Sequence, residues 1–300
     1  MREWTAGGRY RRTDLPPEVW TKLWGEGFRW VDDGPWRTLV DGPGLLTPER
    51  IRAATTEDAW TWVVLPEVDT TMRVAREYLA EGRGPVVVLA DRQHRGRGRR
   101  GRSWMDIPGG SLTLSLGWLP DGNTDGPLTL AVGVAVAEVL EAATGVGIGL
   151  KWPNDGLVRE RKVMGILAEA GRDPRPWVVV GVGVNVNGSA PPEVPDATTL
   201  ETEAGRPFDR AALAVAVADG VAAVLRSWAE PLARDRWLAR WRERSVTLGR
   251  PVEVIQDDQK WSGFAEDVDT AGLLLVRTPL GDLVPVAAGD VSLRPWSTAG

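Results

Sequence analysis

The segment from Arg92 to Trp104 constrains the fold more than any other part of the chain. It reads RQHRGRGRRGRSW and places six arginines and three glycines within thirteen residues. Like charges at this density repel one another, so the segment would stay disordered in water without an anion. Glycine allows a backbone to fold tightly around a ligand, and arginine grips phosphate or carboxylate through paired hydrogen bonds. The pattern favours an anion-binding loop, with a solvated basic loop or a nucleic-acid patch as the alternatives.

The overall charge weighs against an extended nucleic-acid surface. The chain carries 36 basic and 41 acidic residues, a net charge of -5, and has a pI near 5.2. The arginine-rich segment is therefore a local exception on an acidic protein. This contrast favours a focused site for a small anion.

Size and composition exclude several other classes. With 300 residues and 43% hydrophobic content, the chain can bury a full core, and we expect one large domain plus a smaller one. The first residues lack a secretory signal, and no window approaches the roughly 20 apolar residues of a membrane span, so a cytoplasmic location is expected. There is no cysteine and a single histidine, His94, which excludes disulfides, thiolate metal sites and multi-histidine zinc centres.

Hydrophobic periodicity divides the chain into three parts. Residues 1–45 form a Trp-rich extension without a readable helix-turn-helix, which we expect to pack against the main domain. Residues 46–244 alternate helical and strand patterns, and residues 245–300 carry short strands separated by turns. Helices are predicted over 46–54, 69–80, 127–145 and 209–241, strands over 60–68, 85–93, 111–119 and 177–187, a strand leading to a turn over 146–155, and a hairpin over 156–170. Turns at 257–258, 271–272 and 280–281 indicate a small C-terminal barrel.

Five motifs in unbroken order over about residues 60 to 295 resemble those of the biotin protein ligases. They are GRGRRGRSW at 96–104, KWPND at 151–155, RKVMGILAE at 161–169, GVGVNVN at 181–187 and GDVSLR at 289–294. The resemblance is to the form without an N-terminal DNA-binding domain. It implies an α+β fold with a mixed sheet, helices packed on one side as in class II synthetases, and an SH3-like C-terminal barrel.

The same resemblance implies a two-step reaction. ATP and biotin would give biotinyl-5′-adenylate and pyrophosphate, and the biotinyl group would then pass to a lysine of a biotin carboxyl carrier protein domain. In the first step a carboxylate meets an α-phosphate, so positive charge has to converge on the reacting atoms. By the resemblance, Arg97 and Arg99 would neutralise the biotin carboxylate and the phosphates, with Arg102 nearer the nucleotide. Lys162 would touch both the carboxyl oxygen and the α-phosphate.

Other motif positions imply nucleotide and metal contacts. Trp104 would form a wall over adenine, and Asn154 and Asn185 would contact the nucleotide. Asp155 would either help to bind Mg²⁺ with the phosphates of ATP or orient and deprotonate the incoming lysine. The sequence leaves both roles of Asp155 open, and Lys151 ranks below Lys162 as a source of charge.

Biotin itself needs hydrogen bonds to its ureido group and a dry slot for its valeryl chain. The resemblance assigns ureido contacts to Thr70 and Thr71 and further biotin contacts to Gln93 and Gly96. Gly165 would permit close approach of the ligand to a strand.

Three positions depart from the family pattern, and their effect stays open. Met72 stands where the family usually has an amide, and His94 and Arg95 replace small residues. A lipoate or octanoate ligase or transferase of the same fold is the alternative enzyme, and a nucleic-acid-binding regulator is the alternative of another class. We expect a carrier-protein partner, no DNA or membrane partner, and a monomer or weak homodimer.

Overall fold

The structure is a computed structural model. It describes residues 9–14, 16–25, 29–41, 45–55, 60–120, 126–173, 175–256, 259–287 and 290–292. Trp4 and the predicted turn at 257–258 lie outside this range, as do parts of the closing motif at 289–294. No helix in the described ranges is long and apolar enough to cross a membrane.

A seven-stranded mixed sheet forms the centre of the molecule, in the order β4-β5-β6-β10-β9-β8-β7. Its strands are β4 (Thr61–Val68), β5 (Val86–Gln93), β6 (Ser111–Trp118), β7 (Gly149–Lys151), β8 (Asp155–Val158), β9 (Arg161–Gly171) and β10 (Trp177–Asn185). β4 and β5 run parallel, and all other neighbours in the sheet are antiparallel. The predicted mixed sheet is confirmed.

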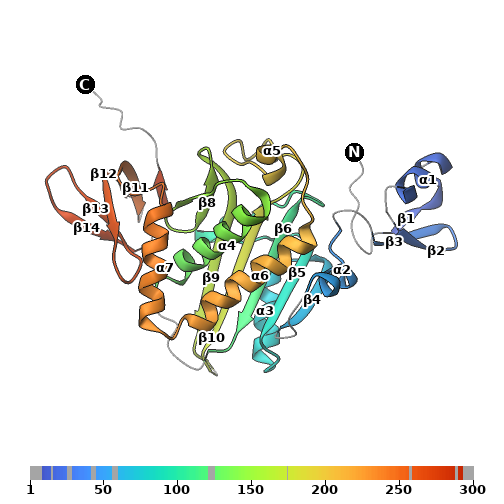
Figure 1. Cartoon of the computed structure of the whole chain (residues 1–300), viewed down its shortest axis with the longest axis horizontal. Helices are drawn as coiled ribbons and strands as arrows, with labels where there is room; N and C mark the ends of the chain where they lie inside the picture. The colour runs from blue at the N-terminus through green and yellow to red at the C-terminus, as the bar shows by residue number, and fades with distance from the viewer. Residues whose placement is uncertain are drawn as a thin grey trace.

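Helices cover both faces of this sheet (Figure 1). On one face, α4 (Leu128–Thr144) and α6 (Arg210–Ser227) share a core with Val87 and Leu89 of β5. The alternate residues of β5 point the other way, where Val86 and Val88 pack with α3 (Thr71–Ala80). The expectation that the helices pack on one side of the sheet therefore holds for α4 and α6, whereas α3 lies on the opposite face.

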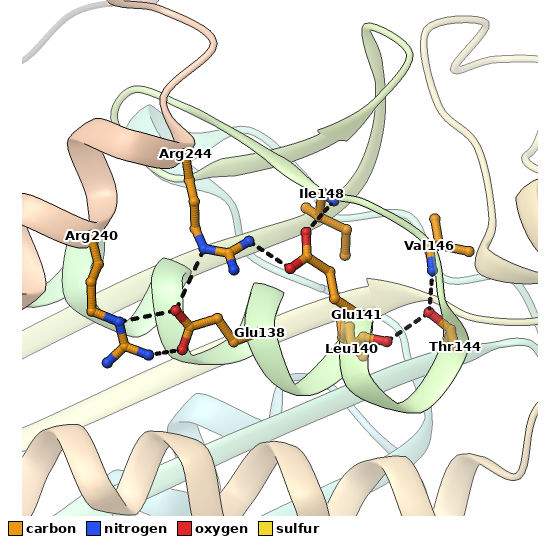
Figure 2. Close-up of polar contacts among 8 residues, drawn as sticks. All are labelled: Glu138, Leu140, Glu141, Thr144, Val146, Ile148, Arg240 and Arg244. Atoms are coloured by element: carbon orange, nitrogen blue, oxygen red, sulfur yellow. Dashed lines mark hydrogen bonds and ion pairs between the residues drawn. The ribbon is translucent and has the colours of Figure 1, made fainter.

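Helix α7 (Pro231–Arg244) is attached to α4 by ion pairs (Figure 2). Arg240 Nε donates to Glu138 at 3.0 Å, and Arg244 Nη1 donates to Glu141 at 2.6 Å. The second carboxylate oxygen of Glu141 accepts the backbone N–H of Ile148 at 2.7 Å. Each of these partly exposed pairs stabilises the fold only slightly, but the network fixes the chain that enters β7.

The C-terminal part is a five-stranded antiparallel sheet in the order β14-β13-β12-β11-β15. Its strands are β11 (Arg250–Gln256), β12 (Gln259–Val268), β13 (Leu274–Arg277), β14 (Leu283–Val286) and β15 (Asp290–Ser292). The fully buried Trp152 joins it to the central sheet, because its indole N–H donates to Gly272 O at 3.0 Å. The backbone N–H of Trp152 donates to Thr247 Oγ1 at 2.9 Å.

The N-terminal extension has its own small fold at the opposite end of the molecule (Figure 1). It comprises β1 (Arg9–Arg11), a 3-10 turn η1 (Arg12–Asp14), α1 (Pro17–Gly25), β2 (Arg29–Asp33) and β3 (Trp36–Asp41), with the sheet order β1-β3-β2. Trp20 is buried edge-on against Trp30 at 5.2 Å between ring centroids, and the Arg37 guanidinium lies over both rings. Trp20 and Trp30 thus pack together in a local core, and the expected packing of the extension against the main domain stays a prediction.

Two short helices complete the described chain. Helix α2 (Pro48–Ala54) lies within the predicted range 46–54, and its start is capped by the Thr47 side chain, which accepts from Arg50 N, with Pro48 in the first turn. Helix α5 (Leu200–Ala204) begins at Thr199, whose side chain accepts from Thr202 N.

Candidate active site

The arginine-rich segment folds as a hairpin over residues 93–106, called the arginine hairpin below. Gly98 N donates to Arg102 O at 2.8 Å, and Trp104 N donates to Gly96 O at 2.9 Å. A Cβ on Gly96 would lie 2.5 Å from Trp104 O. Gly96 thus serves the close approach of the two hairpin strands, and it lies outside the cavity lining described next.

The tip of the hairpin is a 3-10 turn, η2 (Arg99–Gly101). Arg100 has φ of 54° and Gly101 has φ of 75°, so the turn passes through the left-handed region. Arg100 Nη1 donates to Ile255 O of β11 at 3.3 Å. The tip therefore contacts the C-terminal sheet.

A cavity lies between the arginine hairpin, α3 and strands β8 to β10, and it brings together most of the predicted site residues. The predicted residues that line it are Thr70, Thr71, Gln93, Arg97, Arg99, Arg102, Trp104, Asn154, Asp155, Lys162 and Gly165. Val291 of β15 also contributes, so the C-terminal sheet forms part of the wall.

Lys162 and Asp155 form an ion pair in this cavity. Lys162 is the second residue of β9 and Asp155 the first of β8, on strands joined by the charged hairpin that the sequence predicts. Lys162 Nζ lies 2.5 Å from Asp155 Oδ1 and 5.7 Å from the ring centroid of Trp104. The lysine is held near the indole by a carboxylate that is itself largely buried.

The charges of the cavity lining are strongly unbalanced. Five cationic side chains line it, against one carboxylate, that of Asp155. The cations are Arg97, Arg99, Arg102, Lys151 and Lys162. Burial lowers the pKa of Arg99 and of Lys151, while the charge of Asp155 opposes the shift in both. Such a lining favours a ligand with several negative charges.

Glu169 supplies a further counter-charge at the edge of this cluster. Its carboxylate on β9 lies 3.2 Å from Arg97 Nη1. The pair offsets part of the repulsion that the sequence predicts within the hairpin. Arg97 is half-exposed in this position.

Two glycines shape the floor of the cavity. Gly165 of β9 and Gly183 of β10 lie directly opposite each other in the sheet. A Cβ on Gly183 would lie 2.6 Å from Trp104 Cε2, and a Cβ on Gly165 would lie 3.2 Å from Trp104 Cζ3. The indole of Trp104 therefore rests on a stretch of bare backbone.

The end of the cavity near α3 carries neutral hydrogen-bonding groups. Gln93 Oε1 accepts from the backbone N–H of Thr71 at 2.8 Å and from its hydroxyl at 3.2 Å. The Thr71 and Ser115 hydroxyls are 2.7 Å apart. Thr70 precedes the helix without a side-chain capping bond. Beside them Met72 packs on Gly181, where a Cβ would lie 3.0 Å from its sulfur.

The two asparagines have structural partners. Asn154 Nδ2 donates to Ile166 O at 2.9 Å and holds the turn before β8 against β9. Asn185 Nδ2 donates to Thr198 O at 3.1 Å, and Asn185 is not among the residues of the cavity lining. Its observed contact fixes the chain segment whose Asp196 O accepts from Lys162 N.

A Mg²⁺ ion would find few protein ligands at this site. The described ranges contain no group of three or more His, Asp or Glu side chains placed to hold a metal. Mg²⁺ commonly binds one or two carboxylates together with substrate phosphates and water. The cavity lining would therefore suit an ion that arrives with nucleotide phosphates, and Asp155 is the one carboxylate in that lining that could contact it.

Several cavity residues were missed or ranked low from the sequence. Lys151 lines the cavity together with Lys162, although its position in the sequence gave it a lower rank. Its position in KWPND was the available signal. The signal for Ser115 was weaker: it is a polar residue on one face of the alternating strand β6. Val291 stands in the closing motif GDVSLR but was given no role from the sequence, and it reaches the cavity through the packing of the C-terminal sheet.

Comparison with known families agrees with this geometry. Residues 64–187 match the biotin/lipoate A/B protein ligase family, and residues 247–294 match the biotin protein ligase C-terminal domain. A biotin--[acetyl-CoA-carboxylase] ligase of Mycobacterium tuberculosis is 38% identical over 221 residues, which cover 69% of this chain and 78% of the relative. The bifunctional ligase/repressor BirA of Salmonella typhimurium is 32% identical over 270 residues, covering 85% and 83%.

A solved structure shows the same fold. The biotin protein ligase from Aquifex aeolicus in complex with biotin and ATP superposes with a TM-score of 0.68 at 30% identity, covering 80% of this chain and 100% of that one. The chain belongs to the biotin protein ligase family and is a biotin ligase enzyme. The predicted family and fold class are confirmed.

Proposed function

We propose that the enzyme joins biotin to AMP and then transfers the biotinyl group to a lysine of a biotin carboxyl carrier protein domain. In the first step a biotin carboxylate oxygen attacks the α-phosphorus of ATP, and the bond to the β-phosphate oxygen breaks to release pyrophosphate. In the second step the lysine amine attacks the acyl carbon and AMP leaves. The observation that carries this proposal is the Lys162–Asp155 pair, 2.5 Å apart, within a cavity of cationic side chains.

The cationic lining reduces the repulsion between the biotin carboxylate and the phosphates of ATP in the first step. Two anions have to approach within bonding distance, and their repulsion is large where water is excluded. Lys162 is the cation best placed to contact both the biotin carboxylate and the α-phosphate, since Asp155 and the indole of Trp104 hold it in place. Arg99 and Arg102 would bind the phosphates, and Arg97 would leave Glu169 to bind the same ligand.

The remaining cavity groups fit the two ends of a biotinyl adenylate. The hydroxyl and amide groups of Thr71, Gln93 and Ser115 suit a neutral ureido ring, and Met72 adds an apolar wall. The indole of Trp104 suits a stacked adenine.

Asp155 takes part in both steps in this proposal. In the first step it orients Lys162 and would contact a Mg²⁺ brought by ATP, whose positive charge would help to neutralise the phosphates. In the second step its carboxylate is the acceptor nearest Lys162 for the proton of the incoming amine.

The relatives support biotin and a carboxylase carrier. The Aquifex aeolicus structure contains biotin and ATP, and the Mycobacterium tuberculosis relative is named for acetyl-CoA carboxylase. Lipoate ligases share the first family model, but the match of residues 247–294 is to a biotin ligase domain. We therefore favour biotin over lipoate.

The test is mass spectrometry of a carrier domain incubated with the enzyme, MgATP and either biotin or lipoate. The proposal predicts a gain of one biotinyl group on one carrier lysine and pyrophosphate release that depends on biotin. A gain with lipoate alone would contradict it, as would an unmodified carrier in a reaction where a known biotin ligase modifies the same sample.

A further inference from the structure

Asp106 lies at the base of the arginine hairpin, two residues beyond Trp104. Its carboxylate accepts the backbone N–H of Gln93 at 2.5 Å. The backbone bonds Gly98–Arg102 and Gly96–Trp104 join the two hairpin strands above this contact. The Asp106 side chain thus adds a third link between the strands, at the point where the hairpin leaves β5.

Gln93 connects the base of the hairpin to the neutral end of the cavity. Its backbone is held by Asp106, while its side-chain oxygen accepts two hydrogen bonds from Thr71. The Thr71 hydroxyl in turn contacts Ser115. One continuous set of hydrogen bonds therefore runs from the base of the hairpin to the residues proposed to bind the ureido group.

The carboxylate of Asp106 occupies this position against an unfavourable environment. Burial raises its pKa to about 6, although the hydrogen bonds of Gln93, the nearby indole of Trp104 and the charge of Arg92 act in the opposite direction. A neutral side chain would avoid the cost of burying the charge. The position of the carboxylate is therefore explained better by its bond to Gln93 than by packing.

We propose that Asp106 is a positioning residue of the ligase reaction, whose carboxylate closes the base of the arginine hairpin and holds Gln93 toward Thr71. The inference rests on the proposed binding of biotin at this end of the cavity. Asp106 is not in the cavity lining, so it acts through Gln93 and the hairpin rather than by touching the substrate.

Removal of the carboxylate should weaken biotin binding more than it slows the chemical step. Asp106→Ala leaves the Gln93 N–H without its acceptor, so that fewer molecules hold the hairpin closed before biotin binds. Apparent affinity falls in proportion to the fraction of competent molecules. Loss of a hydrogen bond to a charged group is large enough to raise the KM for biotin about tenfold in Asp106→Ala. At saturating biotin, kcat should stay within about threefold, because Lys162 and Arg99 are unchanged.

Asp106→Asn is the conservative variant. Its amide oxygen can accept the same Gln93 N–H, so KM for biotin should stay within about threefold of the parent. Asp209→Ala is the matched structural control. The Asp209 carboxylate also accepts backbone N–H groups, from Ala211 and Ala212 at the start of α6, but it lies outside the cavity. That variant should lose thermal stability without a change in KM.

The experiment measures biotin-dependent pyrophosphate release by the full chain and its three variants. A rise in KM for Asp106→Ala alone supports the proposal. Parent-like KM in Asp106→Ala, an equal rise in Asp106→Asn, or a fall in kcat with unchanged KM would each overturn it.

A second measurement separates this inference from the proposed function. Hydrogen exchange at the Gln93 amide, without any ligand, should be at least about tenfold faster in Asp106→Ala than in the parent and in Asp106→Asn. Equal exchange in all three proteins would refute the role of Asp106 even if biotin activation is confirmed. If the parent fails to activate biotin, the proposed function fails, and this exchange result still decides whether Asp106 closes the hairpin.

Discussion

The indole of Trp104 occupies the space above Gly183 that any side chain at that position would need. A Cβ there would lie 2.6 Å from Cε2 and 2.7 Å from Cζ2 of the ring. Displacing the ring is costly, because Trp104 N is bonded to Gly96 O and the ring moves together with the hairpin backbone. The position of the Trp104 indole therefore requires a glycine at residue 183 of β10.

Gly183→Ala should displace the indole and weaken ATP binding. Overpacking of this kind costs about 1–3 kcal/mol, which corresponds to a rise in KM for ATP of about fivefold to more than a hundredfold if the cost falls on the stacked state. Steady-state kinetics with varied ATP provides the measurement. Gly147→Ala is the control, since a Cβ there meets no atom within 4 Å. An unchanged KM for ATP in Gly183→Ala would argue against Trp104 as the adenine wall.

Lys162→Ala should nearly abolish adenylate formation while the fold is retained. Loss of one preorganised charge at a developing oxyanion costs about 3–4 kcal/mol, or about 10²- to 10³-fold in rate. The assay is single-turnover pyrophosphate release. Lys260→Ala is the control, because that lysine pairs with Glu253 in the C-terminal sheet. Pyrophosphate release at the parent rate in Lys162→Ala would remove this lysine from the mechanism.

Arg99→Gly should release biotinyl adenylate early. The Arg99 side chain is partly buried in the cavity lining and its guanidinium lies 6.0 Å from the ring centroid of Trp152. A guanidinium in the lining can bind the adenylate phosphate through two hydrogen bonds. Arg97 and Lys162 remain to support the first step. We expect adenylate to form but to dissociate about tenfold faster or more, with biotin scattered over lysines of added serum albumin.

The control for this variant is Arg100→Gly, at the neighbouring residue. Arg100 has φ of 54° and contacts Ile255 O, outside the cavity lining. Glycine suits that conformation, so adenylate retention should stay close to that of the parent. Unlabelled albumin with Arg99→Gly would assign the retention of adenylate to another residue.

The arginine hairpin should become more ordered when ligands bind. The excess positive charge of Arg97, Arg99 and Arg102 favours opening of the hairpin, and an anion offsets it. Amide exchange across residues 96–104 should slow on adding biotin and a non-hydrolysable ATP analogue. Equal protection with and without ligands would indicate that the pocket is formed in advance.

The stability difference between Asp106→Asn and the parent should depend on pH. Burial raises the pKa of Asp106 to about 6 from its ordinary value of 3.8. Between these values the unfolded chain has released the proton while the folded protein retains it, so this group's contribution to stability is lost as pH rises. Asparagine does not titrate. The melting temperature of Asp106→Asn minus that of the parent should therefore increase from about pH 4 to about pH 7.

The size of this effect has an upper bound. A shift of about two pKa units corresponds to at most about 3 kcal/mol, or several degrees in melting temperature for a domain of this size. A difference that is flat with pH, or that falls toward neutral pH, would contradict a raised pKa for Asp106.

Local patterns were sufficient to predict most elements of the central domain. The valine-rich stretch at 177–187 is strand β10, and the apolar stretch ending at Gly145 is helix α4, whose C-cap glycine has φ of 75°. The predicted helical stretch over 209–241 is two helices, because Pro231 starts α7 and cannot continue the hydrogen bonds of α6. The sheet of the N-terminal extension was not predicted, because its strands are short and lack apolar alternation.

Site residues that stand in a motif could be predicted from the sequence. Site residues whose role depends on contacts between distant parts of the chain could not. Lys162 and Asp155 stand in motifs and line one cavity together with three arginines of the segment, Arg97, Arg99 and Arg102. Asn185 stands in a motif as well, yet its amide is used to fix Thr198 O. Asp106 could not be recognised, because its importance depends on a bond to Gln93 across the hairpin.

The contacts of Trp152 limit how this enzyme can be recombined with its relatives. A chimera that exchanges the C-terminal sheet alone would keep the indole N–H of Trp152, and its acceptor would have to be a carbonyl of the incoming sheet at the place of Gly272 O. A buried donor without a partner costs about 1–3 kcal/mol, and the same exchange would replace Val291 in the cavity wall. Crossovers should therefore carry residues 151–153 together with the sheet, so that the unit of exchange is discontinuous in the gene although it is contiguous in space.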